Sequence, residues 1–230
     1  MKVKYFHKYN LLKDYIKFDK FRSLRKEILS ISKTEKNFYN GEYFYQSLPS
    51  INLSGLRDTK NRIEKIVTSK LLEGKSVLDI GTNIGSFLIE LNSFFKKGTG
   101  IDLVKTNIQI GNLILKRLGI NNINLINGDF NNYNFNEKFD VIFSLANHST
   151  ADKNIIDEKS YFKKIISLLK INGILVIESH HYLVQSHQEF KKIVEENCLE
   201  KFEILSTGKY DFGNFFDYNR IFYIMRLKNT

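Results

Sequence analysis

From residue 75 onward, short apolar runs alternate with longer segments whose apolar residues recur at helical spacing. The apolar runs are SVLDI, GTGIDL, INLING, FDVIFSL and GILVIES. The segments between them include NIGSFLIELNSFF, KTNIQIGNLILKRLG and EKSYFKKIISLLK, in which apolar residues fall three and four positions apart. Such alternation of strands and helices predicts a mainly parallel sheet with helices on both faces.

The C-terminal part of the chain departs from this alternation. After the helical segment QEFKKIVEENCLEKF come two strand candidates, FEILSTG and RIFYIMRLK, separated only by DFGNFFDYN. Two adjacent strands joined by a short polar segment predict an antiparallel hairpin at the edge of the sheet. The predicted fold class is therefore α/β, with seven strands, mostly parallel, and an antiparallel C-terminal hairpin.

Residues 1–70 are predicted to form a helical N-terminal cap, and residues 71–230 the main domain. Residues 1–36 hold eleven Lys or Arg against four Asp or Glu, a net charge of +7 out of +10 for the chain. This basic segment is compatible with an anionic partner such as RNA, a phosphorylated substrate or a membrane surface. However, Leu24, Ile28 and Ile31 recur at helical spacing, which favours packed helices over a mobile basic tail.

Composition excludes several classes of protein. Hydrophobic residues make up 42% of the 230 residues, enough for a packed core, yet no run approaches the ~20 apolar residues of a membrane-spanning helix. The single cysteine, Cys198, excludes an internal disulfide and a cysteine-based metal site, so no metal is expected. A lone thiol and the lack of a signal-like apolar stretch predict a cytoplasmic protein.

The segment VLDIGTNIGSF, residues 77–87, carries the clearest chemical signal. A strand predicted to end at Asp79 is followed by a turn with Gly81 and Gly85, where the backbone can turn tightly and a ligand can approach. Asp102 lies at the end of the second strand, where a carboxylate can accept both hydroxyls of a ribose. Asp129, followed by Phe130, lies after the third strand, where a carboxylate and an apolar wall can hold an adenine.

These three acids resemble those of class I S-adenosylmethionine-dependent methyltransferases, over roughly residues 70–230. The resemblance implies a Rossmann-like fold, methyl transfer from S-adenosylmethionine, and S-adenosylhomocysteine as the product. Asn83 stands where the family often has a glycine, which requires a left-handed backbone that asparagine tolerates. The cofactor-binding residues implied are Asp79, Gly81, Thr82, Asn83, Gly85, Asp102, Leu103, Asp129, Phe130 and Leu145.

The ends of the fourth and fifth strands are the predicted place of the methyl acceptor. SLANHSTADKN follows the fourth strand and brings Asn147 and His148, and ESHHY ends the fifth with His180 and His181. A histidine can accept a proton from a hydroxyl as the methyl group arrives. We therefore predict His148 and His180 as catalytic and Asn147 and His181 as acceptor-binding residues.

The segment before the glycine turn supplies further acceptor-binding candidates, namely Tyr43, Tyr45, Arg57 and Arg62. Here the chain is similar to tRNA wobble-uridine carboxymethyl-transfer enzymes. The set RDT, ANHST, ESH and GKYDFGNFFDYNR resembles methyltransferases of bacterial surface-polysaccharide clusters more closely, including those for the capsule O-methyl phosphoramidate group.

The resemblance implies a small sugar or phosphoramidate acceptor, methylated at oxygen. Three alternatives stay open: an RNA methyltransferase that uses the basic N-terminal segment, another reaction of the same cofactor such as carboxymethyl transfer, and a nonenzymatic cofactor-binding or scaffold protein. The sequence does not specify the acceptor or the oligomeric state.

Overall fold

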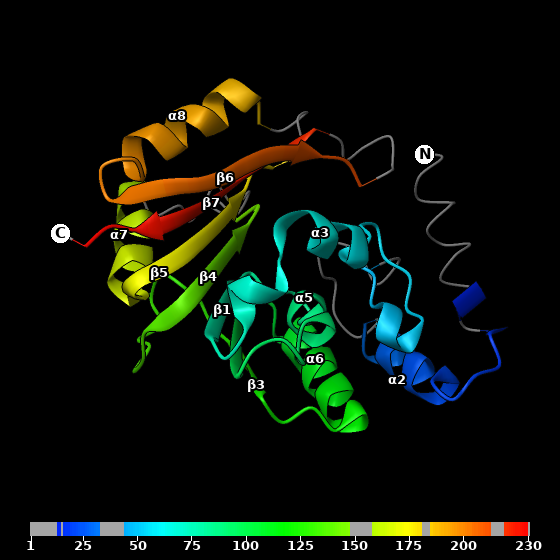
Figure 1. Cartoon of the computed structure of the whole chain (residues 1–230). Helices are drawn as coiled ribbons and strands as arrows, with labels where there is room; N and C mark the ends of the chain where they lie inside the picture. The colour runs from blue at the N-terminus through cyan, green and yellow to red at the C-terminus, as the bar shows by residue number, and fades with distance from the viewer. Residues whose placement is uncertain are drawn as a thin grey trace.

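The computed structural model describes residues 13–14, 16–32, 44–147, 158–180, 185–212 and 219–229. They form a seven-stranded sheet in the order β3-β2-β1-β4-β5-β7-β6 (Figure 1). The strands are β1 (Ser76–Ile80), β2 (Lys97–Asp102), β3 (Ile123–Asn127), β4 (Phe139–Leu145), β5 (Leu169–Glu178), β6 (Phe202–Tyr210) and β7 (Arg220–Leu227). The pairings are parallel except for β7, which runs antiparallel to both β5 and β6. The predicted fold and C-terminal hairpin are thus confirmed.

Helices cover both faces of the sheet, as predicted (Figure 1). They are α2 (Arg22–Ser32), the 3-10 helix η1 (Pro49–Ile51), α3 (Thr59–Ile66), α4 (Ser69–Leu72), α5 (Ser86–Glu90), α6 (Lys105–Leu118), α7 (Glu158–Leu168) and α8 (His187–Asn197). None of these described helices combines the length and the apolar character needed to span a bilayer.

Neighbouring residues of the central strands point to opposite faces and enter two separate hydrophobic clusters. Val77 of β1 packs in the cluster that contains residues of α2, α5 and α6. Leu78, the next residue, packs in the cluster that contains residues of α7 and α8. Because both faces are buried, the central strands read as continuous apolar runs rather than as alternating ones.

Three elements differ from the sequence prediction in extent. Strand β1 continues through Ile80, so Asp79 lies inside the strand, where it is buried, and not at its end. Strand β5 begins at Leu169, which pairs with Phe139 before a register shift. Helix α5 has only five residues and ends at Glu90. In the turn that follows, the backbone N–H and the side-chain amide of Asn92 both donate to the Ile89 carbonyl.

The cap helix α2 packs on the main domain through its predicted apolar positions. Leu24 and Ile28 are buried in the same cluster as residues of α6, so the prediction of a packed helix is confirmed for this segment. The buried guanidinium of Arg25 donates to the Asp14 carbonyl at 2.8 Å and the Ile51 carbonyl at 3.0 Å, and pairs with Asp19 at 2.9 Å. A share of the basic charge of residues 1–36 is therefore used to fold the cap. The boundary between cap and domain at residue 70 stays a prediction.

Asp140 of β4 joins the beginnings of three neighbouring strands, β1, β4 and β5, at the strand ends that lie away from the glycine turn. Its carboxylate accepts hydrogen bonds from the Ser76 backbone N–H at 2.8 Å, the Ser76 hydroxyl at 2.7 Å and the Lys170 ammonium at 2.8 Å. Burial alone would raise the pKa of Asp140, but the hydrogen bonds from Lys170 and Ser76 outweigh it and lower the pKa from its usual 3.8 to about 2.

Asp140→Asn is expected to destabilise the protein in a pH-dependent way. Because the folded-state pKa is depressed, the carboxylate contributes stability above about pH 4 and loses it as the pH falls toward 2. With solvent screening at this partly exposed position, the contribution is about 1 kcal/mol. Urea unfolding of both proteins should show this difference at about pH 6 and a smaller one near pH 2. A difference that does not change with pH would contradict the assignment.

Candidate functional site

The turn between β1 and α5 has the left-handed backbone that the sequence required. Gly81, Asn83 and Gly85 have φ angles of 69°, 55° and 78°, so the condition placed on Asn83 is met. The N–H groups of Gly81 and Thr82 donate to the Ile101 carbonyl at 2.9 and 3.0 Å, which fixes the turn against the end of β2. A Cβ atom on Gly81 would lie 2.3 Å from Oδ1 of Asn147, so only glycine fits there.

Asp79 is a buried carboxyl group directly beneath this turn. Its Oδ2 accepts a hydrogen bond from the Thr82 hydroxyl at 2.8 Å. Burial raises the pKa of Asp79 to about 7, the nearby Asp102 carboxylate adds to the rise, and Thr82 and the Arg62 charge oppose it. A positively charged ligand would stabilise the ionised form of this carboxyl group. The ammonium and sulfonium groups of an amino acid sulfonium compound carry such a charge.

Asp102 connects the turn to the beginning of α6. Its Oδ2 accepts from the Asn83 N–H at 2.8 Å and its Oδ1 from the Val104 N–H at 2.9 Å. These bonds hold the carboxylate in one orientation at the end of β2, which is the position predicted for Asp102, and its ribose-binding role stays a prediction. Leu103, the next residue, is 54% exposed.

The loop after β3 places Phe130 under a positive charge. The Lys164 ammonium lies 5.2 Å from the centre of the Phe130 ring and donates to the Asn131 and Tyr133 carbonyls at 2.9 and 2.7 Å. Asp129 uses both carboxylate oxygens within the loop, accepting from the Asn131 N–H and the Asn132 amide. The Oδ1 of Asn131 is buried without a hydrogen-bond partner in the described part of the chain.

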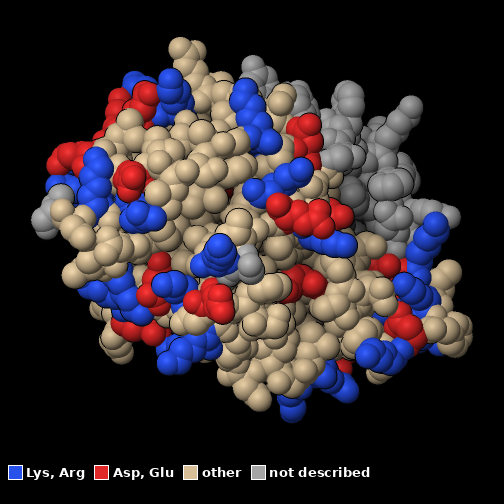
Figure 2. All heavy atoms as spheres, in the orientation of Figure 1, with Lys and Arg blue, Asp and Glu red and all other residues tan. Residues whose placement is uncertain are grey.

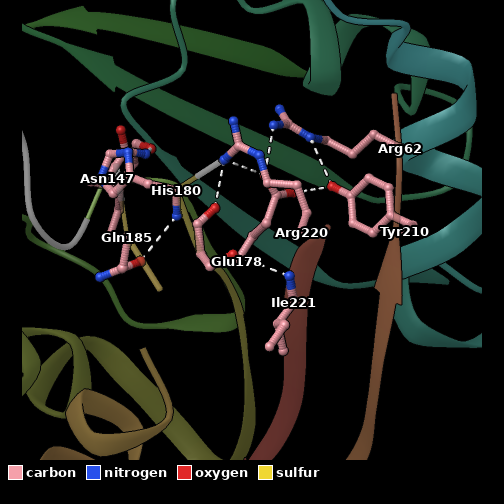
Figure 3. Close-up of polar contacts among 10 residues, drawn as sticks. Arg62, Asn147, Glu178, His180, Gln185, Tyr210, Arg220 and Ile221 are labelled. Atoms are coloured by element: carbon pink, nitrogen blue, oxygen red, sulfur yellow. Dashed lines mark hydrogen bonds and ion pairs between the residues drawn. The ribbon is translucent and has the colours of Figure 1, made fainter. Parts of the chain in front are cut away.

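The ends of β4 and β5 lie side by side, with Leu145 paired to Glu178 in register. Ala146 has a φ of 62°, and its N–H donates to the Glu178 carbonyl at 3.0 Å. Asn147 donates from its side-chain amide to the Ile80 carbonyl, so it holds the glycine turn. The half-buried His180 donates its backbone N–H to Oε1 of Gln185 at 3.1 Å (Figure 3). His148 and His181 lie outside the described residues.

A buried ionic cluster surrounds Glu178, which is fully buried (Figure 3). Its Oε1 pairs with Arg62 of α3 at 2.9 Å and with Arg220 of β7 at 3.2 Å, and its Oε2 accepts from the Tyr210 hydroxyl of β6. Burial raises the pKa of Tyr210 well above its usual value, and the Glu178 charge adds to the rise. Desolvation alone would lower the pKa of Arg62, but the charge of Glu178 together with Tyr210 and Tyr45 outweighs it, so this pKa also rises. The cluster thus joins the cap, β5 and the C-terminal hairpin.

Two arginines of this cluster and a third one, Arg57, lie around the aromatic ring of Phe212. The guanidinium groups of Arg57, Arg62 and Arg220 lie 5.8, 4.9 and 5.7 Å from the centre of the Phe212 ring. Arg57 also lies 3.6 Å from the centre of the Tyr45 ring. The structure thus brings together three of the four upstream candidates, and the fourth, Tyr43, lies outside the described residues. The acceptor-binding role of these residues stays a prediction.

Sequence reasoning missed the partners that complete the cluster. The sequence did not predict Glu178, Arg220, Tyr210 or Phe212 as site residues. Arg220 opens a strongly apolar strand, RIFYIM. A charged residue there was the available signal, because an arginine at a buried strand position needs a buried counter-charge.

The residues present fit S-adenosylmethionine. The glycine turn has the left-handed backbone of the motif, Asp79 lies buried within β1 next to the turn and Asp102 lies at the end of the adjacent β2, and Asn131 holds a buried acceptor oxygen beside Phe130. Such a set offers carboxylates to a ribose and an amino acid part, and an apolar wall with an acceptor to an adenine.

Comparison with known proteins supports this interpretation. Residues 71–222 match the family model described as a methyltransferase domain. The human protein named EEF1A lysine methyltransferase 2 is 35% identical over 144 residues, which cover 60% of this chain and 59% of the relative. The ribosomal protein L11 methyltransferase of Fusobacterium nucleatum is 26% identical over 145 residues, 62% of this chain and 46% of the relative. The chain thus spans less than two thirds of the length of these curated relatives.

A solved structure extends the likeness of fold to nearly the whole chain. The N-methyltransferase NodS from Bradyrhizobium japonicum, in complex with S-adenosyl-L-homocysteine, has a TM-score of 0.62 at 16% identity and covers 91% of this chain and 98% of its own. The sheet order, the glycine turn and the family model agree with one another. The chain belongs to the class I S-adenosylmethionine-dependent methyltransferase family.

Proposed function

We propose that this protein transfers the methyl group of S-adenosylmethionine to an oxygen of a small acceptor that carries an anionic group. The observation that carries this proposal is the group of arginines Arg57, Arg62 and Arg220 around Phe212, next to the ends of β4 and β5. Guanidinium groups bind carboxylates and phosphates through paired hydrogen bonds, and here Arg62 and Arg220 already hold one carboxylate, that of Glu178, in this way.

In this mechanism the protein mainly positions the reactants. S-adenosylmethionine, when bound, supplies a methyl group activated by its sulfonium charge, and S-adenosylhomocysteine is left. Asp102 and the glycine turn would hold the ribose, Asp79 the amino acid part, and Phe130 the adenine. Asn147, which fixes the turn through the Ile80 carbonyl, would keep the acceptor side aligned with it. Holding the acceptor oxygen in line with the methyl group supplies much of the rate.

His148 and His180 are the candidate bases of this proposal. A hydroxyl acceptor loses its proton as the carbon–oxygen bond forms, and an imidazole at the ends of β4 and β5 can take that proton. An acceptor oxygen that is already ionised, as in a phosphate or phosphoramidate, needs only a hydrogen-bond donor. The resemblance to surface-polysaccharide methyltransferases favours an acceptor of the sugar or phosphoramidate class.

A protein acceptor is the second candidate. The names of two relatives support a protein acceptor, because EEF1A lysine methyltransferase 2 and ribosomal protein L11 methyltransferase are named for protein substrates. An RNA acceptor has less support, since Arg25 of the basic N-terminal segment is buried in contacts with the cap itself.

The proposed function is tested by measuring S-adenosylhomocysteine release with three acceptor panels. The panels are sugar phosphates and phosphoramidates, lysine-containing proteins, and RNA. Turnover with the first panel only, coupled to methylation at oxygen, is the expected result. Turnover confined to proteins or RNA would contradict the proposal, and so would cofactor binding without turnover in all three panels.

Asp102→Ala is expected to weaken binding of S-adenosylhomocysteine in calorimetry. The variant removes charge-assisted hydrogen bonds to the ribose worth about 1.5–3 kcal/mol, or roughly tenfold to a hundredfold in Kd. Asp140→Ala is the matched control, because Asp140 is an aspartate at the opposite ends of the strands, near the beginning of β4. Equal affinities of the Asp102→Ala protein and the parent, with both folded, would contradict the cofactor assignment.

Replacement of His148 or His180 by glutamine separates the two acceptor chemistries. If a histidine acts as the base for a hydroxyl, its replacement should lower kcat by about 10²–10⁴-fold, and the parent rate should rise with pH through the histidine range. With an ionised acceptor the same variants should raise KM and leave a flat pH profile. His187→Gln, on α8, is the control. Unchanged kcat and KM in both variants would exclude either role.

A further inference from the structure

A second concave surface runs along the sheet, from the strand ends that lie away from the glycine turn to Phe222, which pairs with Glu178 of β5. It is a groove of about 550 Å³ between residues 64–75 and the exposed face of β5, β7 and β6. One wall comes from the end of α3, from α4 and from the turn before β1, up to Lys75. The other wall includes Asn172 of β5 and Arg226 of β7, near the beginning and the end of their strands. The groove is therefore separate from the cofactor turn at Gly81.

The rim of the groove is positively charged. Lys65, Lys70 and Lys75 line it, and within the described parts of the chain none of the three has an ion pair. Glu64, the one acidic residue that lines the groove in the described part of the chain, lies 4.0 Å from the ammonium of Lys60. Figure 2 views the same side of the molecule as Figure 1 and shows blue Lys and Arg side chains interspersed with red Asp and Glu side chains over the tan surface. An acidic ligand would thus meet three unneutralised cations.

The floor of the groove is apolar. It is formed by Ile66, Val67, Leu71, Ile174, Leu205, Phe222 and Ile224. Leu205 is 40% exposed and lies where the pairing of β6 with β7 shifts register, on the edge strand of the sheet. An exposed leucine beside unpaired lysines is the combination that receives an amphipathic chain, with apolar side chains on the floor and acidic ones at the rim.

We propose that this groove docks an acidic segment of a partner protein, anchored by aliphatic side chains. Single-stranded nucleic acid is disfavoured as the occupant because its binding uses stacking on aromatic rings. Phe222, the only aromatic residue among the described lining residues, is 8% exposed. A membrane surface is disfavoured because a groove recessed between a helix and a sheet does not meet a flat plane of headgroups. The docking site does not depend on the identity of the methyl acceptor.

The probe for this site is a short fluorescein-labelled peptide that alternates Glu and Leu, with a Lys–Leu peptide as its control. Its binding to the full chain is followed by fluorescence anisotropy. The groove variant combines Lys65→Glu, Lys70→Glu and Lys75→Glu. The matched control combines Lys116→Glu, Lys138→Glu and Lys163→Glu, which are also exposed and without an ion pair in the described structure and change the net charge equally. Circular dichroism and S-adenosylhomocysteine affinity verify that both variants are folded.

The groove variant should weaken binding of the Glu–Leu peptide at least about tenfold, whereas the control triple should leave it within about twofold. Leu205→Asp should weaken it as well, because the apolar anchor is lost. Equal weakening by the two triple variants would overturn the proposal, since it would reveal attraction to net charge alone. The proposal is also overturned if the peptide does not bind, or if the groove triple instead abolishes binding of polyadenylate RNA or phosphatidylglycerol vesicles and spares the peptide.

Discussion

The buried carboxylate of Glu178 is the interaction on which the arrangement of the site depends. A charge removed from water costs several kcal/mol unless partners replace the lost hydration. Glu178 obtains these partners from three other elements, with Arg62 on α3, Tyr210 on β6 and Arg220 on β7. Because each partner is also buried, none of the four polar groups can be left unmatched without a large loss of stability. The cap, the central sheet and the C-terminal hairpin are thereby held in one relative position.

The same cluster influences the cofactor side of the site. The charge of Arg62 lowers the pKa of Asp79, in opposition to burial and to the charge of Asp102. Asp102 in turn orients the Asn83 N–H of the glycine turn, and Asn147 fixes the turn from the end of β4. The acids and the turn are therefore held by protein contacts alone, and a site that is organised in advance loses less freedom on binding.

The elements of the sheet could be predicted because their signals are local. Continuous apolar runs indicate strands buried on both faces, and the requirement for a left-handed Asn83 follows from the motif itself. The ionic cluster could not be predicted, because Arg62 and Glu178 are 116 residues apart and only the fold brings them together. The groove escaped prediction for the same reason, since its walls come from α3, α4 and three strands. The early end of α5 also escaped prediction, because the turn that follows it, in which the Asn92 backbone and side chain both donate to the Ile89 carbonyl, is seen only in the structure.

Hydrogen exchange of the Glu178→Gln protein tests this account most directly, with Glu203→Gln, an exposed glutamate on β6, as the matched control. The variant leaves two buried arginines without their counter-charge. We predict faster amide exchange in α3 and in the β6–β7 hairpin together, while β1, β2 and β3 keep the protection of the parent protein. Unchanged exchange in α3, or a uniform increase over the whole sheet, would contradict the claim that this buried carboxylate holds the cap and the hairpin against the site.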